Sequence, residues 1–431
     1  MKRKLMHKLQ HWRHKANRMP LLLYGARQVG KTYILKQFGE SCYNNVVYFN
    51  FENDVRARSV FDGNLDANAI ISHLELLGQQ RIIPGETLVV LDEIQACERA
   101  LTSLKTFCEN APQFHVAAAG SLMGVAFNRE RFSFPVGKVD EMTLYPMDFE
   151  EFLWALEQTA LSEKIREHYL SSEKLANALH DLALDCWRQY LVVGGMPGAV
   201  AEYCRSRSFV EVADLQSRVL NDYVADMAKY ATPSTSVKIR ACYNSIPAQL
   251  AKENRKFQYK VVQRGGSSAM FGEAIEWLKC AGVIIKCEKV SHGTVPIAAY
   301  SDLADFKIYM SDVGLLTFKS GMPSSILLSQ LNEDNTFMGA VAENYVAQSL
   351  VASGHDVYYW RSDNTAELDF LIQLGGNVIP IEVKKGRNTR SKSLSVFVGK
   401  YHPELSLRIS RKNFGEENGI KSVPLYAAFC I

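Results

Sequence analysis

An eight-residue motif near the N-terminus has the residue types and spacing to bind phosphate. It reads G-x-x-x-x-G-K-T and consists of Gly25, Ala26, Arg27, Gln28, Val29, Gly30, Lys31 and Thr32. The two glycines let the backbone wrap around phosphate, because no Cβ obstructs it. Lys31 is expected to reach the β- and γ-phosphates of a nucleotide, and the Thr32 hydroxyl to hold Mg²⁺. The motif therefore predicts a P-loop that binds ATP with Mg²⁺.

The residues on either side of this motif predict the two elements that a P-loop needs. Leu21–Tyr24 is short and apolar, as expected for a buried parallel strand, and Tyr33–Phe38 has the pattern of a first helical turn. The N-terminus of such a helix directs backbone N–H groups and the positive end of its dipole at the bound anion. A chance glycine-rich turn would not require both neighbours.

A second apolar run, Thr87–Leu91, ends in Asp92 and Glu93 about sixty residues beyond the P-loop. A buried strand in this position delivers an aspartate to Mg²⁺, and the adjacent glutamate can polarise the water that attacks the γ-phosphate. We therefore expect Asp92 to hold the metal together with Thr32, and Glu93 and Lys31 to be catalytic. The combination predicts ATP hydrolysis.

A third apolar run, Phe114–Ala119, ends in Gly120 and Ser121. In sheets of this kind the strand after the aspartate-bearing strand carries a polar side chain beside the γ-phosphate, which makes Ser121 a candidate nucleotide contact. Ser121 could equally be the N-cap of the segment that follows.

A strand expected at Ala366–Ile372 carries acidic residues near the C-terminus. Its alternating pattern puts Glu367 and Asp369 on one face and Leu368 and Phe370 on the other. The acidic face is then available for chemistry, while the apolar face packs on the core.

The next expected strand, Val378–Lys384, follows a glycine turn and has Glu382 and Lys384 on one face. Asp369, Glu382 and Lys384 are then expected to meet, with Glu343 close by on an upstream helix. This is the layout of the PD-(D/E)xK nuclease core, in which carboxylates hold Mg²⁺ or Mn²⁺ against the scissile phosphate and the lysine assists the attacking water. It predicts a catalytic Lys384 and a second metal at Asp369, Glu382 and Glu343. Alternatively, this strand face holds only an intramolecular Glu–Lys pair.

The segment 233–310 predicts helices followed by a strand pair, which is the arrangement of a winged helix. Helices are expected at Val237–Leu250 and Met270–Cys280, and strands at Gly282–Lys286 and Val295–Tyr300.

Basic and aromatic residues gather in and around Lys256–Val261, which has a short β-like pattern. They are Lys252, Arg255, Lys256, Phe257, Tyr259, Lys260 and Arg264. Cations for phosphate and aromatic rings for stacking would suit a nucleic acid. The same residues could instead form a solvated basic loop on a domain used for packing.

The composition is that of a globular chain with several domains. Its 431 residues are 47% hydrophobic and 22% charged, and 49 basic residues nearly balance 46 acidic ones, so overall charge does not indicate a polyanionic partner. Nine scattered cysteines without a C-x-x-C pair argue against a disulfide framework or a zinc site. No signal peptide or transmembrane run is evident. We therefore expect a cytoplasmic protein without a membrane partner.

These elements predict an α/β protein in which a parallel P-loop sheet with a helical lid precedes a winged-helix region and a PD-(D/E)xK-like domain. A capping box at Asp148 and Glu151 is expected to open the helical lid. The expected parts are a lead helix at 1–17, an ATPase core at 18–145, a helical lid at 146–232, a winged-helix-like region at 233–310 and a restriction-endonuclease-like domain at 311–431.

The chain resembles prokaryotic AAA-type ATPases that end in a DUF4143 domain. The resemblance is carried across nearly the whole chain by the motifs LLLYGARQVGKT, LVVLDEIQ, GSL, FPVGK, LYPMDFEEFL, GGMP, YMSDVGLL, ENYV, ELDF and PIEVK. It implies ATP and Mg²⁺ binding at Gly25–Thr32, Asp92 and Glu93, a winged helix and a restriction-endonuclease-like C-terminal domain. An arginine finger is not evident, although Arg129 and Arg131 follow the third strand.

Two functions follow from these observations. The first is a Mg²⁺-dependent ATPase coupled to a nuclease-like domain that acts on nucleic acid, DNA in preference to RNA, in a chain that could form a homo-oligomer. The second is a nucleotide-controlled binding or signalling switch whose nuclease-like fold does not cut.

Overall fold

The structure, a computed structural model, describes residues 1–431 except 121–134, 254, 330–334, 363–365 and 387–391. The chain divides into two compact units. One comprises Lys2–Tyr145 with Cys280–Gly282, and the other comprises Pro146–Lys279 and Val283–Ile431 with Met1. No helix in the described ranges is long and apolar enough to cross a membrane. All nine cysteines lie in those ranges as free thiols.

The N-terminal unit is built on a five-stranded parallel sheet with the order β2-β3-β4-β1-β5. The five strands expected from the sequence are confirmed: β1 (Leu21–Tyr24), β2 (Asn45–Asn50), β3 (Thr87–Asp92), β4 (His115–Ala119) and β5 (Asp140–Thr143). Because all strands run in one direction, β1 and β3 end at the same edge of the sheet. The P-loop and Asp92 therefore meet there.

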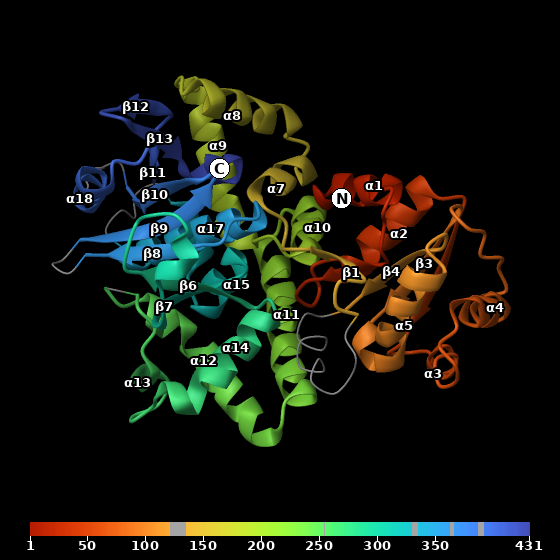
Figure 1. The fold of residues 1–431 in the computed structure, drawn as a ribbon. Coiled ribbons are helices and arrows are strands. Elements are labelled where there is room, and N and C mark those ends of the chain that lie inside the picture. Colours follow the sequence, from red (N-terminus) through yellow and green to blue (C-terminus); the bar gives the residue numbers. More distant parts are fainter. Residues whose placement is uncertain (121–134, 254, 330–334, 363–365, 387–391) are drawn as a thin grey trace. The chain divides into compact units, whose positions relative to one another are not determined.

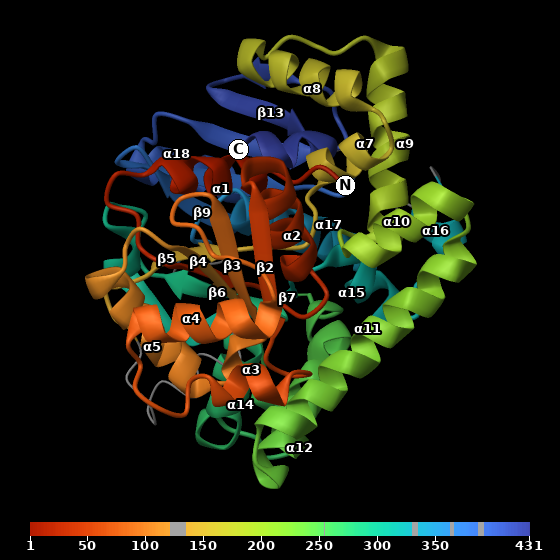
Figure 2. The same ribbon diagram turned by 90° about the vertical axis from the view of Figure 1, so that its right-hand side faces the viewer.

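Helices cover both faces of this sheet (Figures 1 and 2). On one face lie α1 (Leu5–His14) and α2 (Lys31–Cys42), and on the other α3 (Val55–Ser59), α4 (Ala67–Gly78) and α5 (Glu98–Asn110). The core under the second group includes Leu22, Val89, Leu91, Val116, Ile70, Leu74, Leu101 and Leu104. Strands buried on both faces explain why the sequence shows continuous apolar runs here instead of alternation.

Helix α1 packs as part of this unit and is not a separate leading segment. Its apolar stripe of Leu5, Leu9 and Trp12 is buried, as the three- and four-residue spacing of an amphipathic helix requires. The indole Nε1 of Trp12 donates to the Met19 carbonyl oxygen at 2.9 Å, and its ring lies 6.2 Å from that of Phe38 in α2.

The second unit begins with a helical region. Its helices are α7 (Phe149–Ala155), α8 (Thr159–Ser171), α9 (Asn177–Val193), α10 (Pro197–Ser206), α11 (Phe209–Tyr230), α12 (Pro233–Leu250), α13 (Tyr259–Val262) and α14 (Ser268–Cys280). The capping box expected at the start of α7 is confirmed, since the side chains of Asp148 and Glu151 each accept a hydrogen bond from the other's backbone N–H.

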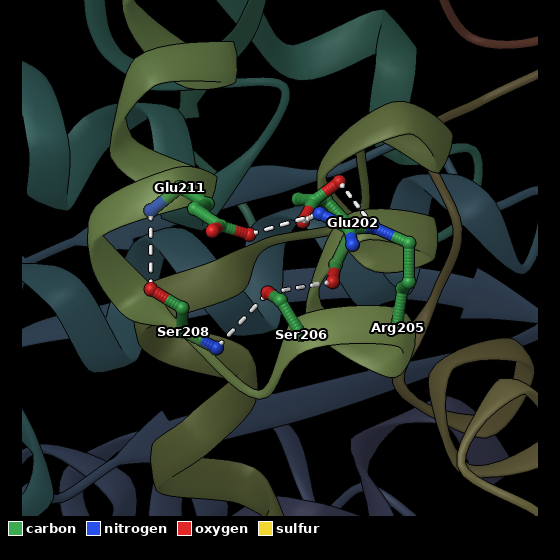
Figure 3. A network of polar contacts seen from close by, with 5 residues as sticks. All are labelled: Glu202, Arg205, Ser206, Ser208 and Glu211. Carbon is green, nitrogen blue, oxygen red and sulfur yellow. Dashed lines mark hydrogen bonds and ion pairs between the residues drawn. The ribbon is translucent and has the colours of Figure 1, made fainter.

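A polar network fixes the corner between α10 and α11 (Figure 3). Arg205 donates from Nη2 to Glu202 at 2.6 Å and to Glu211 at 3.1 Å. Ser206 Oγ accepts from the Ser208 backbone N–H, and Ser208 Oγ accepts from the N–H of Glu211 as the N-cap of α11. The corner is thus closed by both ion pairs and capping.

An eight-stranded mixed sheet follows, with the order β12-β13-β11-β10-β9-β8-β6-β7. Its strands are β6 (Ile284–Val290), β7 (Ser301–Met310), β8 (Tyr358–Arg361), β9 (Glu367–Leu374), β10 (Asn377–Val383), β11 (Ser406–Ser410), β12 (Gly415–Glu417) and β13 (Ile420–Pro424). The associated helical segments are η2 (Ile297–Tyr300), α15 (Val313–Lys319), α16 (Ser324–Leu328), α17 (Phe337–Ala352), α18 (Lys392–Tyr401) and η3 (Leu425–Cys430).

Two expected strands are wrong. Lys256–Val261 contributes one isolated bridge at Lys256 and then the short helix α13, and Val295–Tyr300 leads into the 3₁₀ turn η2 instead of a strand. The partner of β6 is β7, which begins at Ser301, one residue later than the expected strand ends. Because β6 also pairs with β8, the boundary expected between 310 and 311 separates strands of one sheet.

Helix α17 is buried along most of its length, and its polar side chains replace missing strand partners. Asn344 accepts from Met310 N at 2.7 Å and donates to Met310 O at 2.9 Å. Gln348 accepts from Val313 N at 2.9 Å and donates to the Tyr190 hydroxyl at 2.8 Å. Buried polar groups that are satisfied in this way hold a helix in one register.

Candidate functional site

The P-loop of the N-terminal unit has a backbone that only glycine accommodates at two positions. Gly30 caps α2 with φ 94°, in the left-handed region. A Cβ on Gly25, whose φ is 151°, would collide with the carbonyl oxygen of Leu144. The loop between them leads directly into the N-terminus of α2, so its backbone N–H groups and the helix dipole are available to an anion.

The Lys31 side chain lies within the loop. Its Nζ donates to the carbonyl oxygens of Gly25 and Ala26 at 2.9 and 3.0 Å, and the residue is buried. A phosphate oxygen placed in the loop could take over from these carbonyl acceptors. The ammonium group is therefore already held at the anion site.

Asp92 and Thr32 are in direct contact, as the sequence predicts. Thr32 Oγ1 donates to Asp92 Oδ2 at 2.6 Å, and Asp92 is only 1% exposed. Tyr48 OH donates to the same Oδ2 at 2.8 Å, and Glu93 N donates to Oδ1 at 3.0 Å. Burial, with a smaller contribution from the neighbouring Asp92, raises the pKa of Tyr48 to about 12, so its hydroxyl remains a donor at neutral pH.

Glu93 turns away from the strand in a left-handed conformation with φ 52°. Such a backbone is uncommon for a non-glycine residue and is frequent at functional sites. The Gln95 side-chain amide donates to the Glu93 carboxylate, and Gln95 is largely buried. The carboxylate is thus held by a partner from the turn η1 (Ile94–Ala96).

Three residues of this site were not identified from the sequence. Arg3 donates from Nη1 to the P-loop carbonyl of Val29 at 3.0 Å, and Tyr48 and Gln95 hold the two carboxylates. Pairing of Asn50 with Asp92 in the sheet would have pointed to Tyr48, two residues earlier on the same face. Arg3 carried no signal, since it belongs to a basic N-terminal segment that otherwise looks solvated.

The residues present fit a nucleotide with Mg²⁺. The evidence for this is a glycine-dependent loop, a buried lysine at the loop and a Thr–Asp pair of oxygen donors beside the helix N-terminus. Hydroxyl and carboxylate oxygens are the ligands that Mg²⁺ prefers. Ser121, Arg129 and Arg131 lie outside the described residues.

The C-terminal strands bring part of the second predicted site together. Lys384 pairs with Glu382, which is buried. Asp369 Oδ2 accepts from the backbone N–H of Val383 at 2.8 Å, so Asp369 lies beside the end of β10 as expected. Glu367 of the same strand forms an ion pair with Lys307 at 2.6 Å.

Glu343 does not complete a three-carboxylate metal site. It forms an ion pair with Arg255 and accepts from Tyr309 OH at 3.3 Å. Across the described ranges, no group of three His, Cys, Asp or Glu side chains is placed to hold a metal ion.

The expected face assignment on β9 is also partly wrong. Leu368 packs with Leu371 in the cluster under α18, whereas the ring of Phe370 lies 5.5 Å from that of Tyr309. The register between β8 and β9 shifts between Tyr358 and Trp360. This irregularity breaks the two-residue alternation on which the expectation depended.

The basic segment around Lys256 does not form an open nucleic-acid face. Arg255 pairs with Glu343, Lys256 pairs with Asp305 at 2.7 Å, and Lys252 donates to Gln258 at 3.0 Å. Phe257 is buried against Phe306 with ring centroids 5.5 Å apart, which removes it from stacking on bases. Of the five cations, Lys260 and Arg264 are the exposed ones.

Comparisons with known families divide the chain into three matched regions. Residues 17–153 match the AAA domain family AAA_14. Residues 184–348 match a domain of unknown function, DUF8612, and residues 338–428 match another, DUF4143. The boundaries expected at 232 and 310 both fall inside the DUF8612 match.

Similarity to individual proteins is limited to short segments or to low identity. Uncharacterised proteins of Mycobacterium tuberculosis and Mycobacterium bovis are each 36% identical over 81 residues, which cover 18% of this chain and 18% of each relative. The matched segment thus spans less than a fifth of those relatives' length.

Two solved structures are similar over most of the chain. The Walker-type ATPase of Pyrococcus abyssi aligns with a TM-score of 0.47 and 14% identity, covering 74% of this chain and 95% of that one. The ORC2 protein of Aeropyrum pernix aligns with a TM-score of 0.37 and 12% identity, covering 79% and 94%. By its family matches, the chain belongs to the proteins that join an N-terminal AAA domain to a C-terminal DUF4143 domain, as its motifs predict.

Proposed function

We propose that the N-terminal unit binds ATP with Mg²⁺ and hydrolyses it. The observation that carries this proposal is the 2.6 Å hydrogen bond between Thr32 Oγ1 and Asp92 Oδ2, at the point where the P-loop enters α2. It joins the two oxygen donors that would hold the cation, which come from residues sixty positions apart.

The residues around this pair have separate roles. The loop N–H groups and Lys31 would bind the β- and γ-phosphates, and Lys31 would exchange its contacts with Gly25 and Ala26 for phosphate oxygens. When bound at Thr32 and Asp92, Mg²⁺ would offset negative charge on those phosphates. Tyr48 keeps the Asp92 carboxylate in place.

Glu93 is the proposed general base for the attacking water. Its carboxylate is held by the Gln95 amide, and its backbone N–H is held by Asp92. A carboxylate fixed from both sides has little freedom to reorient, which favours a single water position.

The experiment is a steady-state ATPase assay on the full chain with and without Mg²⁺, together with direct nucleotide binding. Lys31→Ala should weaken binding, and Asp92→Asn should abolish Mg²⁺-dependent turnover. Lys105→Ala removes an exposed lysine from α5 of the same unit and is the matched control. Turnover that is equal in the Asp92→Asn and control variants would refute the proposal.

For the second unit we infer a role directed at nucleic acid, with metal-dependent cleavage as the candidate activity. The contact between Asp369 and the N–H of Val383, next to Glu382, favours it. Two carboxylates and Lys384 then lie at one end of β9 and β10, which is the minimum for holding a cation against a phosphodiester. The pairing of Glu343 with Arg255 favours the alternative, a nucleotide-controlled switch that does not cut.

A cleavage assay distinguishes these two roles. Single- and double-stranded DNA and RNA are incubated with the protein, ATP and Mg²⁺ or Mn²⁺. Cleavage that is lost in Lys384→Ala and kept in Lys400→Ala, an exposed lysine of α18, supports the nuclease. Binding without any cut in wild type supports the switch.

A further inference from the structure

A small cavity in the second unit is lined by positive charge. Three cations border it, Arg188, Lys385 and Arg411, together with Trp187 and an apolar floor that includes Met338 and Ala342. None of the described residues that line it is acidic. About 30 Å³ is open to the centres of water-sized molecules, which is room for about two waters or one tetrahedral oxyanion.

Four elements of the same unit position these side chains. Trp187 and Arg188 come from the C-terminal half of α9, and Met338 and Ala342 from the first turns of α17. Lys385 and Arg411 follow β10 and β11, which are parallel neighbours, so the ends of both strands meet at this cavity. The N-terminal turns of a sixteen-residue helix add the positive end of its dipole.

The indole of Trp187 gives an independent indication of a ligand. Trp187 is 3% exposed and its Nε1 has no hydrogen-bond partner in the described structure. A buried N–H without an acceptor costs free energy, and here it lies at the wall of a cation-lined cavity. An oxyanion in the cavity would supply the missing acceptor.

The cations are held in place without being fully neutralised. Arg188 pairs with Asp185, whose side chain is half exposed, and Lys385 Nζ donates to the Asn335 carbonyl oxygen at 3.2 Å. A carbonyl acceptor does not cancel the ammonium charge. The cavity therefore keeps an excess of positive charge next to the Glu382–Lys384 pair, one residue before Lys385.

We propose that this cavity is an oxyanion site that binds a phosphate group of a nucleic-acid strand next to Asp369, Glu382 and Lys384. The chemistry required is a tetrahedral oxyanion, which charged donors bind more strongly than neutral ones. Assigning it to a nucleic-acid strand, and not to free phosphate, depends on the proposed function of the second unit.

The test uses the full chain carrying Lys31→Ala, so that the P-loop does not contribute. Binding of radiolabelled inorganic phosphate is measured by equilibrium dialysis, and binding of a fluorescent twelve-nucleotide DNA strand by anisotropy. Lys385→Gln and Arg411→Gln should each weaken both ligands roughly tenfold or more, since each loses a charged hydrogen bond. Trp187→Phe, which keeps the ring but not the N–H, should weaken phosphate roughly threefold.

Lys400→Gln removes the same charge from the exposed face of α18 and should change neither affinity. Phosphate binding that is no tighter in the parent protein than in the Lys385→Gln, Arg411→Gln double variant would overturn the site. If only phosphate binding weakens and DNA binding does not, the ligand is free phosphate and the assignment to a strand is wrong. ATP turnover with Lys31 intact is measured separately, and its absence would refute the ATPase without affecting this site.

Discussion

Arg3 holds the P-loop from outside it: its guanidinium Nη1 lies 3.0 Å from the carbonyl oxygen of Val29. Nη2 of the same side chain donates to the Tyr145 carbonyl oxygen at 2.6 Å. One buried arginine therefore connects the start of the chain, the nucleotide loop and the segment after β5. Because charged donors make the stronger hydrogen bonds, this contact can restrict the loop conformation that a phosphate requires.

Replacing Arg3 should weaken nucleotide binding. Arg3→Met keeps much of the side-chain volume but leaves the Val29 and Tyr145 carbonyl oxygens without this donor, so we expect a loss of about 1–3 kcal/mol in the free energy of unfolding. The dissociation constant for ATP, measured by calorimetry, should rise. Lys8→Met, an exposed position on α1, is the control. An unchanged ATP affinity in Arg3→Met would show that the contact serves only α1.

Glu93→Gln should bind ATP normally and fail to turn it over. The carboxylate is needed mainly in the transition state, where it accepts a proton from water, whereas Lys31 contacts phosphate already in the ground state. We expect kcat to fall roughly 10²- to 10⁴-fold with little change in ATP affinity. Full turnover by Glu93→Gln would assign the base to another residue.

Gln95→Ala tests whether the amide positions Glu93. Without its donor the carboxylate can adopt more conformations, so kcat should fall about tenfold, while the KM for ATP and the melting temperature stay near their wild-type values. Gln95→Glu cannot donate to Glu93 and should behave no better. A parallel loss of stability and activity would instead indicate a packing role for Gln95.

The nucleotide site was predictable because it depends on local sequence. Gly25, Gly30 and Lys31 occur in one loop, and the apolar run before Asp92 is long enough to define a buried strand. What the sequence could not supply were contacts between distant segments, such as Arg3 with Val29, because nothing local distinguishes Arg3 from a solvated arginine.

The second unit shows the opposite situation. The basic cluster around Lys256 was visible in the sequence, but its partners Glu343 and Asp305 are 88 and 49 residues away in the numbering and neutralise it only in the folded chain. Likewise, the irregularity that separates Leu368 from Phe370 depends on the register with β8, which strand alternation alone does not encode.

Asp312 should give the protein a distinctive pH dependence of stability. It is fully buried and accepts from the backbone N–H groups of Gly195 at 2.5 Å and Leu315 at 2.8 Å. Burial raises the pKa of its carboxyl from 3.8 to about 6 in the folded protein. Between about pH 4 and pH 6 the folded form therefore holds more protons than the unfolded form. Its contribution to the free energy of unfolding falls as pH rises, by up to about 3 kcal/mol.

Urea unfolding at several pH values checks this contribution. The difference in unfolding free energy between wild type and Asp312→Asn should decrease from pH 4 to pH 6 and be constant above that range. Asp356→Asn, at an exposed aspartate, should show no such decrease. Parallel pH profiles for wild type and Asp312→Asn would contradict the assignment.

The Arg255–Glu343 pair distinguishes a structural role from a nucleic-acid role for the most buried cation of the basic segment. The side chains are 19% and 5% exposed. Removing one partner of a buried pair leaves an uncompensated charge, so Arg255→Met should lower the free energy of unfolding by about 3–5 kcal/mol. The additional change Glu343→Gln should recover much of that loss, because the unpaired carboxylate is then gone. Lys260→Met, at the exposed surface of α13, should leave stability unchanged. If Arg255→Met instead weakens DNA binding at full stability, Arg255 faces the nucleic acid and the pairing with Glu343 is not its function.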